Sequence, residues 1–143
     1  MKRLEEVRPE FVEVIPDQLE EGVIYISISY ATILHRCLCG CGAEIVTPLS
    51  PTDWELTYDG NSVSLSPSVG NWSYPCQSHY WIRRNQVHWA RRFSERQIAA
   101  VRERDRRAKL GLPLDEERVF SEREKITEPG SRKLRRMWRR LGR

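Results

Sequence analysis

The chain has 143 residues, 39% of them hydrophobic and 31% charged, and a net charge of +4. This length corresponds to about one domain, and no run of about 18 apolar residues that could span a bilayer is present. The first residues also lack the apolar segment of a secretion signal. We therefore expect a cytoplasmic protein with no membrane contact, in which thiols stay reduced and clustered cysteines are metal ligands or reactive groups rather than disulfides.

The charge differs between the two parts of the chain. Residues 1–82 carry four basic and eleven acidic side chains, a net of −7, whereas residues 83–143 carry twenty basic and nine acidic ones, a net of +11. This asymmetry indicates an acidic body followed by a basic extension.

Alternating and β-branched segments predict strands in the body. A strand is expected at residues 22–28 and another at 43–49. Two alternating segments over 54–66 flank Asp59-Gly60-Asn61 and predict a hairpin. A loop is expected at 67–75, and a second hairpin at 79–90.

From Ser94 the composition becomes helical. Residues 94–110 predict a helix, and a second short helix is expected at 131–141. The sequence thus predicts a mainly β fold, a small antiparallel sheet resembling a zinc ribbon, with a basic helical tail. The domain boundaries that we expect are 1–92 for a zinc-stabilised β domain and 93–143 for a basic helical extension.

The cysteines are the clearest chemical signal. Cys37, Cys39 and Cys41 lie within five positions, and Cys76 lies beyond the first hairpin. Four thiolates suit a tetrahedral Zn²⁺ ion, which would stabilise a body with a small core. Spacing alone leaves a second ligand set open, in which His79 replaces one cysteine. A site filled by four protein ligands would be structural, so any catalysis would need other residues.

The polar residues offer a candidate catalytic pair. If His79 is not a ligand, its imidazole could act as a general base. Ser78 is adjacent in sequence, so its side chain would point to the opposite face of a strand. Ser68 is therefore the preferred nucleophile, with Ser78 as the alternative. His35 is expected near the metal rather than as a base, and His88 is expected only to pack.

Other groups could complete such a site. Gly70 and Asn71 could present N–H donors to an oxyanion, and Asp53 or Asp59 could orient the imidazole. Loop serines are commonly turn formers, so the residues alone leave open whether the protein is an enzyme.

Several motifs in order resemble one bacterial family of small domains. They are "FVEVIPDQLEEGVIYIS", "CLCGCG", "TPLSPTDWELTYDG", "VSLSPSVGNW" and "PCQSHYWIRRNQVHWA", which together cover residues 11–90. Members of the family are encoded beside ubiquitin-like conjugation genes. The resemblance implies zinc binding and a serine-type peptidase role toward a ubiquitin-like protein, with Cys37, Cys39, Cys41 and Cys76 matching the family's cysteines and Ser68, Ser78 and His79 its polar positions.

Three functional hypotheses result. The leading one is a deubiquitinase-like serine peptidase that matures or removes a bacterial ubiquitin-like protein on a scaffold stabilised by structural zinc. The second is a non-catalytic zinc-binding adaptor that recruits the conjugation enzymes of that pathway. The third is a regulator that binds nucleic acid through the basic tail, for which affinity should fall steeply with salt. The sequence does not indicate an oligomeric state.

Overall fold

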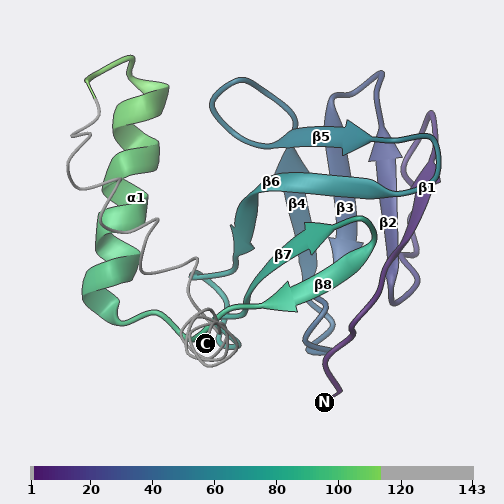
Figure 1. Cartoon of the computed structure of the whole chain (residues 1–143), viewed down its shortest axis with the longest axis horizontal. Coiled ribbons are helices and arrows are strands. Elements are labelled where there is room, and N and C mark those ends of the chain that lie inside the picture. Colours follow the sequence, from purple (N-terminus) through teal and green to yellow (C-terminus); the bar gives the residue numbers. More distant parts are fainter. Residues whose placement is uncertain (1, 114–143) are drawn as a thin grey trace, which may run out of the picture.

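Two four-stranded sheets and one helix make up the described part of the chain, residues 2–113 of this computed structural model (Figure 1). The first sheet has the strand order β1-β2-β3-β4 and the second has the order β5-β6-β7-β8. The strands are β1 (Arg8–Phe11), β2 (Val23–Ser27), β3 (Thr32–Arg36), β4 (Glu44–Pro48), β5 (Glu55–Tyr58), β6 (Val63–Gly70), β7 (His79–Arg83) and β8 (Gln86–Trp89). The mainly β prediction is confirmed.

The first sheet contains strands that the sequence analysis did not identify. β1 pairs with β2 in parallel, and β3 joins β2 to β4 through antiparallel ladders. The sequence patterns predict no strand at residues 32–36, where β3 lies. Its burial alternates, with Ile33 and His35 inside, so β3 is a half-buried strand, and it ends at Arg36, directly before Cys37.

The second sheet follows the two predicted hairpins. The carboxylate of Asp59 accepts hydrogen bonds from the N–H groups of Asn61 and Ser62, which fixes the turn between β5 and β6. Arg84 and Asn85 have positive φ angles and form the tight turn between β7 and β8. The two hairpins lie side by side because β6 also pairs with β7.

The loop predicted at 67–75 is shorter than expected because β6 continues to Gly70. The register between β6 and β7 is irregular between Leu65 and Val69. Pro67 lies inside this irregular stretch, and proline has no N–H to donate to a ladder. The strand therefore bends here, and Ser68 lies on the bend.

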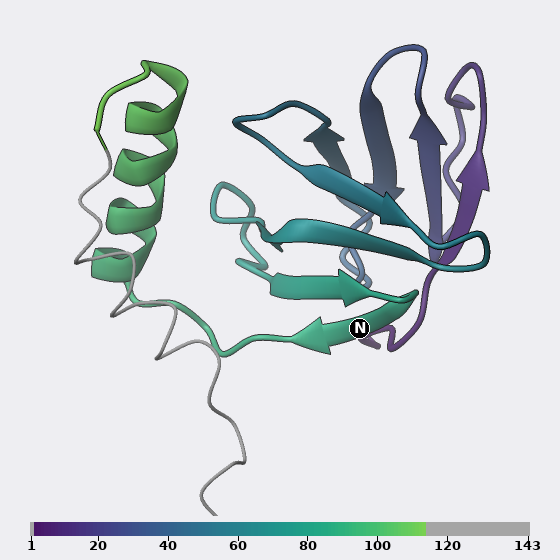
Figure 2. The same ribbon diagram turned by 45° about the horizontal axis from the view of Figure 1, so that its top comes forward.

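The core lies between the two sheets. The large side chains that are fully buried come from both, including Ile24 and Ile33 of the first sheet and Tyr80 and Ile82 of the second. Figures 1 and 2 show the sheets stacked, with the β5–β8 sheet in front of the β1–β4 sheet. Their shared core holds the β3–β4 turn close to the β6–β7 loop.

The helix α1 (Glu95–Lys109) stands beside the sheets, as Figure 2 shows. Ser94 caps it in a capping box with Gln97, as the cap residue predicts. Ile98 is its one buried residue, and Lys109 Nζ lies 3.0 Å from Asp53 Oδ1. The predicted helix at 131–141 lies outside the described residues. Within residues 2–113, no helix has the length and apolar character needed to cross a membrane.

Candidate catalytic and metal site

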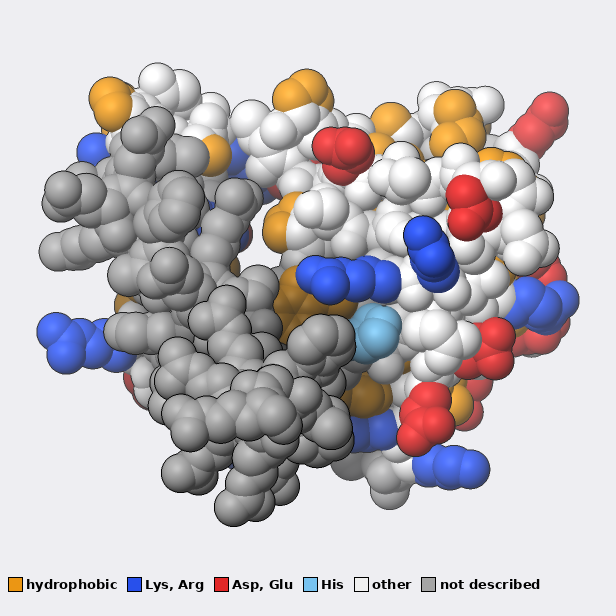
Figure 3. All heavy atoms as spheres, in the orientation of Figure 1, with side chains coloured by type: hydrophobic (Ala, Val, Ile, Leu, Met, Phe, Trp, Pro, Cys, Tyr) orange, Lys and Arg blue, Asp and Glu red, His pale blue; other side chains and the backbone are white. Residues whose placement is uncertain are grey.

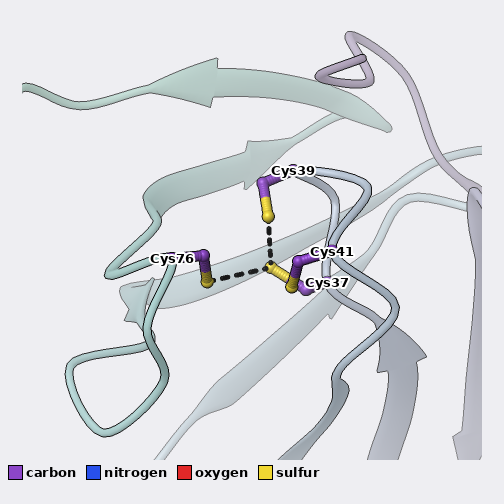
Figure 4. A group of neighbouring side chains, drawn as sticks. All are labelled: Cys37, Cys39, Cys41 and Cys76. Atoms are coloured by element: carbon purple, nitrogen blue, oxygen red, sulfur yellow. Dashed lines mark hydrogen bonds between the residues drawn. The ribbon is translucent and has the colours of Figure 1, made fainter. Parts of the chain in front are cut away.

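The four cysteines meet at one end of the two sheets (Figure 4). Cys37, Cys39 and Cys41 come from the turn after β3, and Cys76 comes from the loop before β7. All four Sγ atoms lie within 4.8 Å of one another. Gly40 and Gly42 have positive φ angles, which glycine adopts without strain and which let the turn direct three thiols toward one point.

The spacing of the sulfur atoms fits a tetrahedral ion. Four sulfurs about 2.3 Å from a Zn²⁺ ion would lie roughly 3.8 Å apart. The Sγ atoms of Cys37 and Cys76 are 3.9 Å apart, and those of Cys37 and Cys39 are 3.3 Å apart. All four thiols are free of disulfides. This cluster of cysteines could hold a metal ion, and four thiolates are the donor set that Zn²⁺ prefers.

Polar side chains support the cysteine cluster. Ser78 Oγ lies 3.1 Å from Cys37 Sγ and 3.5 Å from Cys76 Sγ. Asn71 Nδ2 donates to Ser78 Oγ at 2.8 Å and to Cys37 Sγ at 3.5 Å. Hydrogen bonds of this kind orient metal ligands and stabilise their charge.

The thiols ionise unequally in the absence of an ion. Burial raises the pKa of Cys37 and of Cys39. Burial also opposes ionisation of Cys76, but its hydrogen bonds, with those from Ser78 the largest, lower its pKa to about 7. Four thiolates can therefore coexist here only if a cation compensates their charge.

The second feature is a close contact between a serine and a histidine. His79 is the first residue of β7, and its Nε2 atom lies 2.7 Å from Ser68 Oγ on the bend of β6. Gly70 pairs with His79 in the ladder, so the two strands fix this approach. Ser78, one residue before His79, points instead to the cysteines. The structure thus brings Ser68 to the imidazole and places Ser78 in the cysteine cluster.

Aromatic rings surround the His79 side chain, which is 4% exposed. The ring centroids of Trp72, Trp81 and Phe93 lie 4.9 Å, 5.1 Å and 4.5 Å from the imidazole centroid. Phe93 also stacks on Trp72 at 5.0 Å. Gly70 is required beside them, because a Cβ atom there would collide with the Trp72 indole.

Burial in this aromatic surrounding lowers the pKa of His79 from 6.5 to about 4. The imidazole is therefore neutral at physiological pH and can accept a proton at Nε2. Its Nδ1 atom is buried and has no hydrogen-bond partner among residues 2–113. The arrangement that results is a Ser–His pair without a third residue.

Some expected supporting groups are engaged elsewhere. Asp53 accepts a hydrogen bond from Ser50 and pairs with Lys109, and Asp59 is bonded to its own turn, so neither orients His79. The N–H of Asn71 donates to the carbonyl of Ser78 at 2.9 Å, so it is not free for an oxyanion. The bonds of Asp53 to Ser50 and of Asp59 to Ser62 are local turn contacts, whereas the contact of Asp53 with Lys109 depends on where α1 packs.

The other two histidines have different surroundings. His35 is fully buried, its Nε2 atom lies 2.8 Å from the Tyr80 hydroxyl, and burial lowers its pKa to about 4. It belongs to the core behind the cysteines. His88 was expected to pack, but it is exposed on β8 and lines a surface groove. The only sequence signal for this exposure is the strand period of two, which places His88 on the face opposite to that of the buried Val87.

Comparison with known proteins gives one match. The family model described as "Bacterial ubiquitination-like system serine protease (BubE)" matches residues 11–90. The matched region contains both the cysteine cluster and the Ser68–His79 pair, and it ends before Phe93 and α1. No curated protein and no solved structure matches the chain.

Proposed function

Because the chain belongs to the BubE family of serine proteases of bacterial ubiquitination-like systems, we propose that it cleaves the peptide or isopeptide bond after the C-terminal tail of a ubiquitin-like protein. Ser68 is the nucleophile and His79 the general base. The observation that carries this proposal is the 2.7 Å contact between Ser68 Oγ and a neutral imidazole nitrogen. A general base needs this reach and this protonation state.

The chemistry proceeds in two steps. Ser68 Oγ attacks the carbonyl carbon while Nε2 of His79 takes the hydroxyl proton, and the same proton then passes to the leaving amine as the C–N bond breaks. A water molecule, deprotonated by His79, then attacks the acyl-enzyme, and as the bond between the acyl carbon and Ser68 Oγ breaks the proton passes from His79 to Oγ and the tail carboxylate is released. The tetrahedral oxyanion needs an N–H donor. We assign this role to the N–H of Ser68, a residue with no paired residue in the β5–β6 or β6–β7 ladder.

Aromatic rings replace part of the role of the missing third residue. In a Ser–His–Asp triad the carboxylate stabilises the imidazolium that forms during attack. Here Nδ1 of His79 has no such partner among residues 2–113, and the rings of Trp72 and Trp81, with centroids about 5 Å from the imidazole, replace only the orienting role of that residue by holding the ring in place. The same rings exclude water from the base.

The four cysteines hold a structural ion in this proposal. Zn²⁺ would link the β3–β4 turn to the loop before β7, and Cys76 lies only three residues before His79. The ion would supply no open position for water, because all four ligands are thiolates. Its contribution to catalysis is to hold His79 against Ser68.

The test is cleavage of a ubiquitin-like precursor with residues beyond its tail. Ser68→Ala should abolish cleavage while preserving the circular dichroism spectrum and metal content. Ser73→Ala, in an exposed loop, is the matched control and should cleave at the wild-type rate. Cleavage by Ser68→Ala would reject this nucleophile. Failure of the wild-type protein to cleave, with binding retained, would indicate the adaptor function instead.

A further inference from the structure

A groove of about 650 Å³ crosses the outer face of the β5–β8 sheet next to the Ser68–His79 pair. Ser66, Pro67 and Trp81 line the end nearest the pair. Trp81 also contacts His79, so the groove and the proposed catalytic pair share a wall. An extended chain whose carbonyl reaches Ser68 would therefore continue into this groove.

The far end of the groove is positively charged. Arg83 and Arg84 line it, whereas His88 lies opposite Trp81 in the β7–β8 ladder, and none of the ten lining residues in the described part of the chain is acidic. In Figure 3, basic side chains and a histidine lie close together near the middle of this face.

Arg83 is the better placed of the two arginines to bind a ligand. Both are exposed, but Arg84 contributes to lowering the pKa of Asp59, so its charge is partly compensated. Arg83 makes no ion pair within residues 2–113, and its guanidinium lies 6.0 Å from the Trp81 ring centroid. An unpaired guanidinium beside an aromatic ring suits a carboxylate that packs on the ring.

We propose that this groove binds an extended acidic segment of the substrate and that Arg83 contacts a glutamate or aspartate side chain in it. The inference rests on the proposed peptidase function and adds the chemical class of sequence that the site selects. Arg84 borders the same position and favours the same charge.

The register of the sheet gives the position of the acidic residue. Arg84 N–H donates to Ser64 Oγ at 2.9 Å, so the arginine end of the groove lies at Ser64. Arg83 is four residues from His79 on β7, whose pairing with β8 is regular, and this corresponds to about 13 Å along a strand. A substrate in extended conformation covers this distance in about four residues. The acidic side chain should thus lie three or four residues from the cleaved bond.

The first experiment moves one glutamate through an otherwise neutral peptide, on both sides of the bond, and measures kcat/KM. We expect a maximum three or four residues from the bond on one side, about fivefold above the all-neutral peptide at low salt. Arg83→Gln should remove this preference, mainly through KM, whereas Arg8→Gln on β1 should preserve it. A flat profile, or an Arg83→Gln variant that keeps the preference, would overturn the inference.

The second experiment separates this inference from the proposed catalysis. Ser68→Ala is titrated with a fluorescent glutamate-containing decapeptide and its glutamine counterpart, followed by fluorescence anisotropy. Tighter binding of the glutamate peptide that weakens with salt and with Arg83→Gln supports the groove, whether or not cleavage is ever observed. Equal affinity for the two peptides overturns it, even if the wild-type protein cleaves.

Discussion

Because Phe93 helps to bury His79, the effect of removing Phe93 on the pKa of His79 can be predicted with a magnitude. The pKa of His79 is lowered from 6.5 to about 4 because burial disfavours the charged imidazolium. At about 1.36 kcal/mol per pKa unit, this shift is a preference of roughly 3 kcal/mol for the neutral form. Phe93 covers the ring at 4.5 Å, and its replacement by alanine would admit water. We expect Phe93→Ala to raise the pKa by about one unit or more toward 6.5.

The assay is an NMR titration of the histidine Cε1–H signals. Three histidines are present, and their signals are assigned with single His→Gln variants. The matched control is Phe11→Ala, which removes a half-exposed phenyl ring that packs on Tyr58 at 4.9 Å in another part of the molecule. It should leave the pKa of His79 near 4. A wild-type His79 that titrates near 6.5, or one unaffected by Phe93→Ala, would refute the account.

The same variant should change the pH dependence of cleavage. The base must be neutral, so activity is lost as pH falls through its pKa. With a pKa of about 4, roughly 90% of the imidazole is neutral at pH 5, and with a pKa of about 5.5 only roughly a quarter is neutral. The acid limb of kcat/KM should move to higher pH in Phe93→Ala and stay in place in Phe11→Ala.

Three further substitutions test the remaining parts of the site. Ser78→Ala removes the hydroxyl that contacts Cys37, Cys76 and the Asn71 amide, so we expect weaker metal retention during chelator titration but unchanged dependence of cleavage on Ser68. Cys76→Ser should lower the metal content measured by mass spectrometry and lower the Tm, because one of four ligands is lost. Gly70→Ala would displace the Trp72 indole from its position against His79. We therefore expect kcat to fall more than tenfold while the Tm changes by only a few degrees. A variant with the wild-type kcat would contradict the packing described.

Local patterns were sufficient to predict part of the fold. Asp59-Gly60 and the alternating segments around it predict a hairpin because turn chemistry and strand period act over a few residues. Ser94 with Gln97 marks the start of α1 in the same way. The mainly β class follows from these short-range signals. The parallel β1–β2 pair could not be predicted, because it depends on long-range packing rather than on a turn.

The candidate site was predictable to a similar extent. Because successive side chains on a strand point to opposite faces, the sequence favours Ser68 over Ser78 as the partner of His79. The structure places Ser68 Oγ 2.7 Å from Nε2 of His79. Their catalytic roles stay a proposal. The bend of β6 and the cover provided by Phe93 were not predictable, because the first depends on a register irregularity around Pro67 and the second on the path of the chain beyond the family motif.

The most direct test of the central proposal is to identify the residue that reacts with a fluorophosphonate probe. Tandem mass spectrometry of the labelled protein should find the adduct on Ser68, and the adduct should be absent from His79→Ala because the base that activates the hydroxyl is gone. An adduct on Ser78, or precursor cleavage that persists while Ser68 stays unmodified, would contradict the assignment of nucleophile and base.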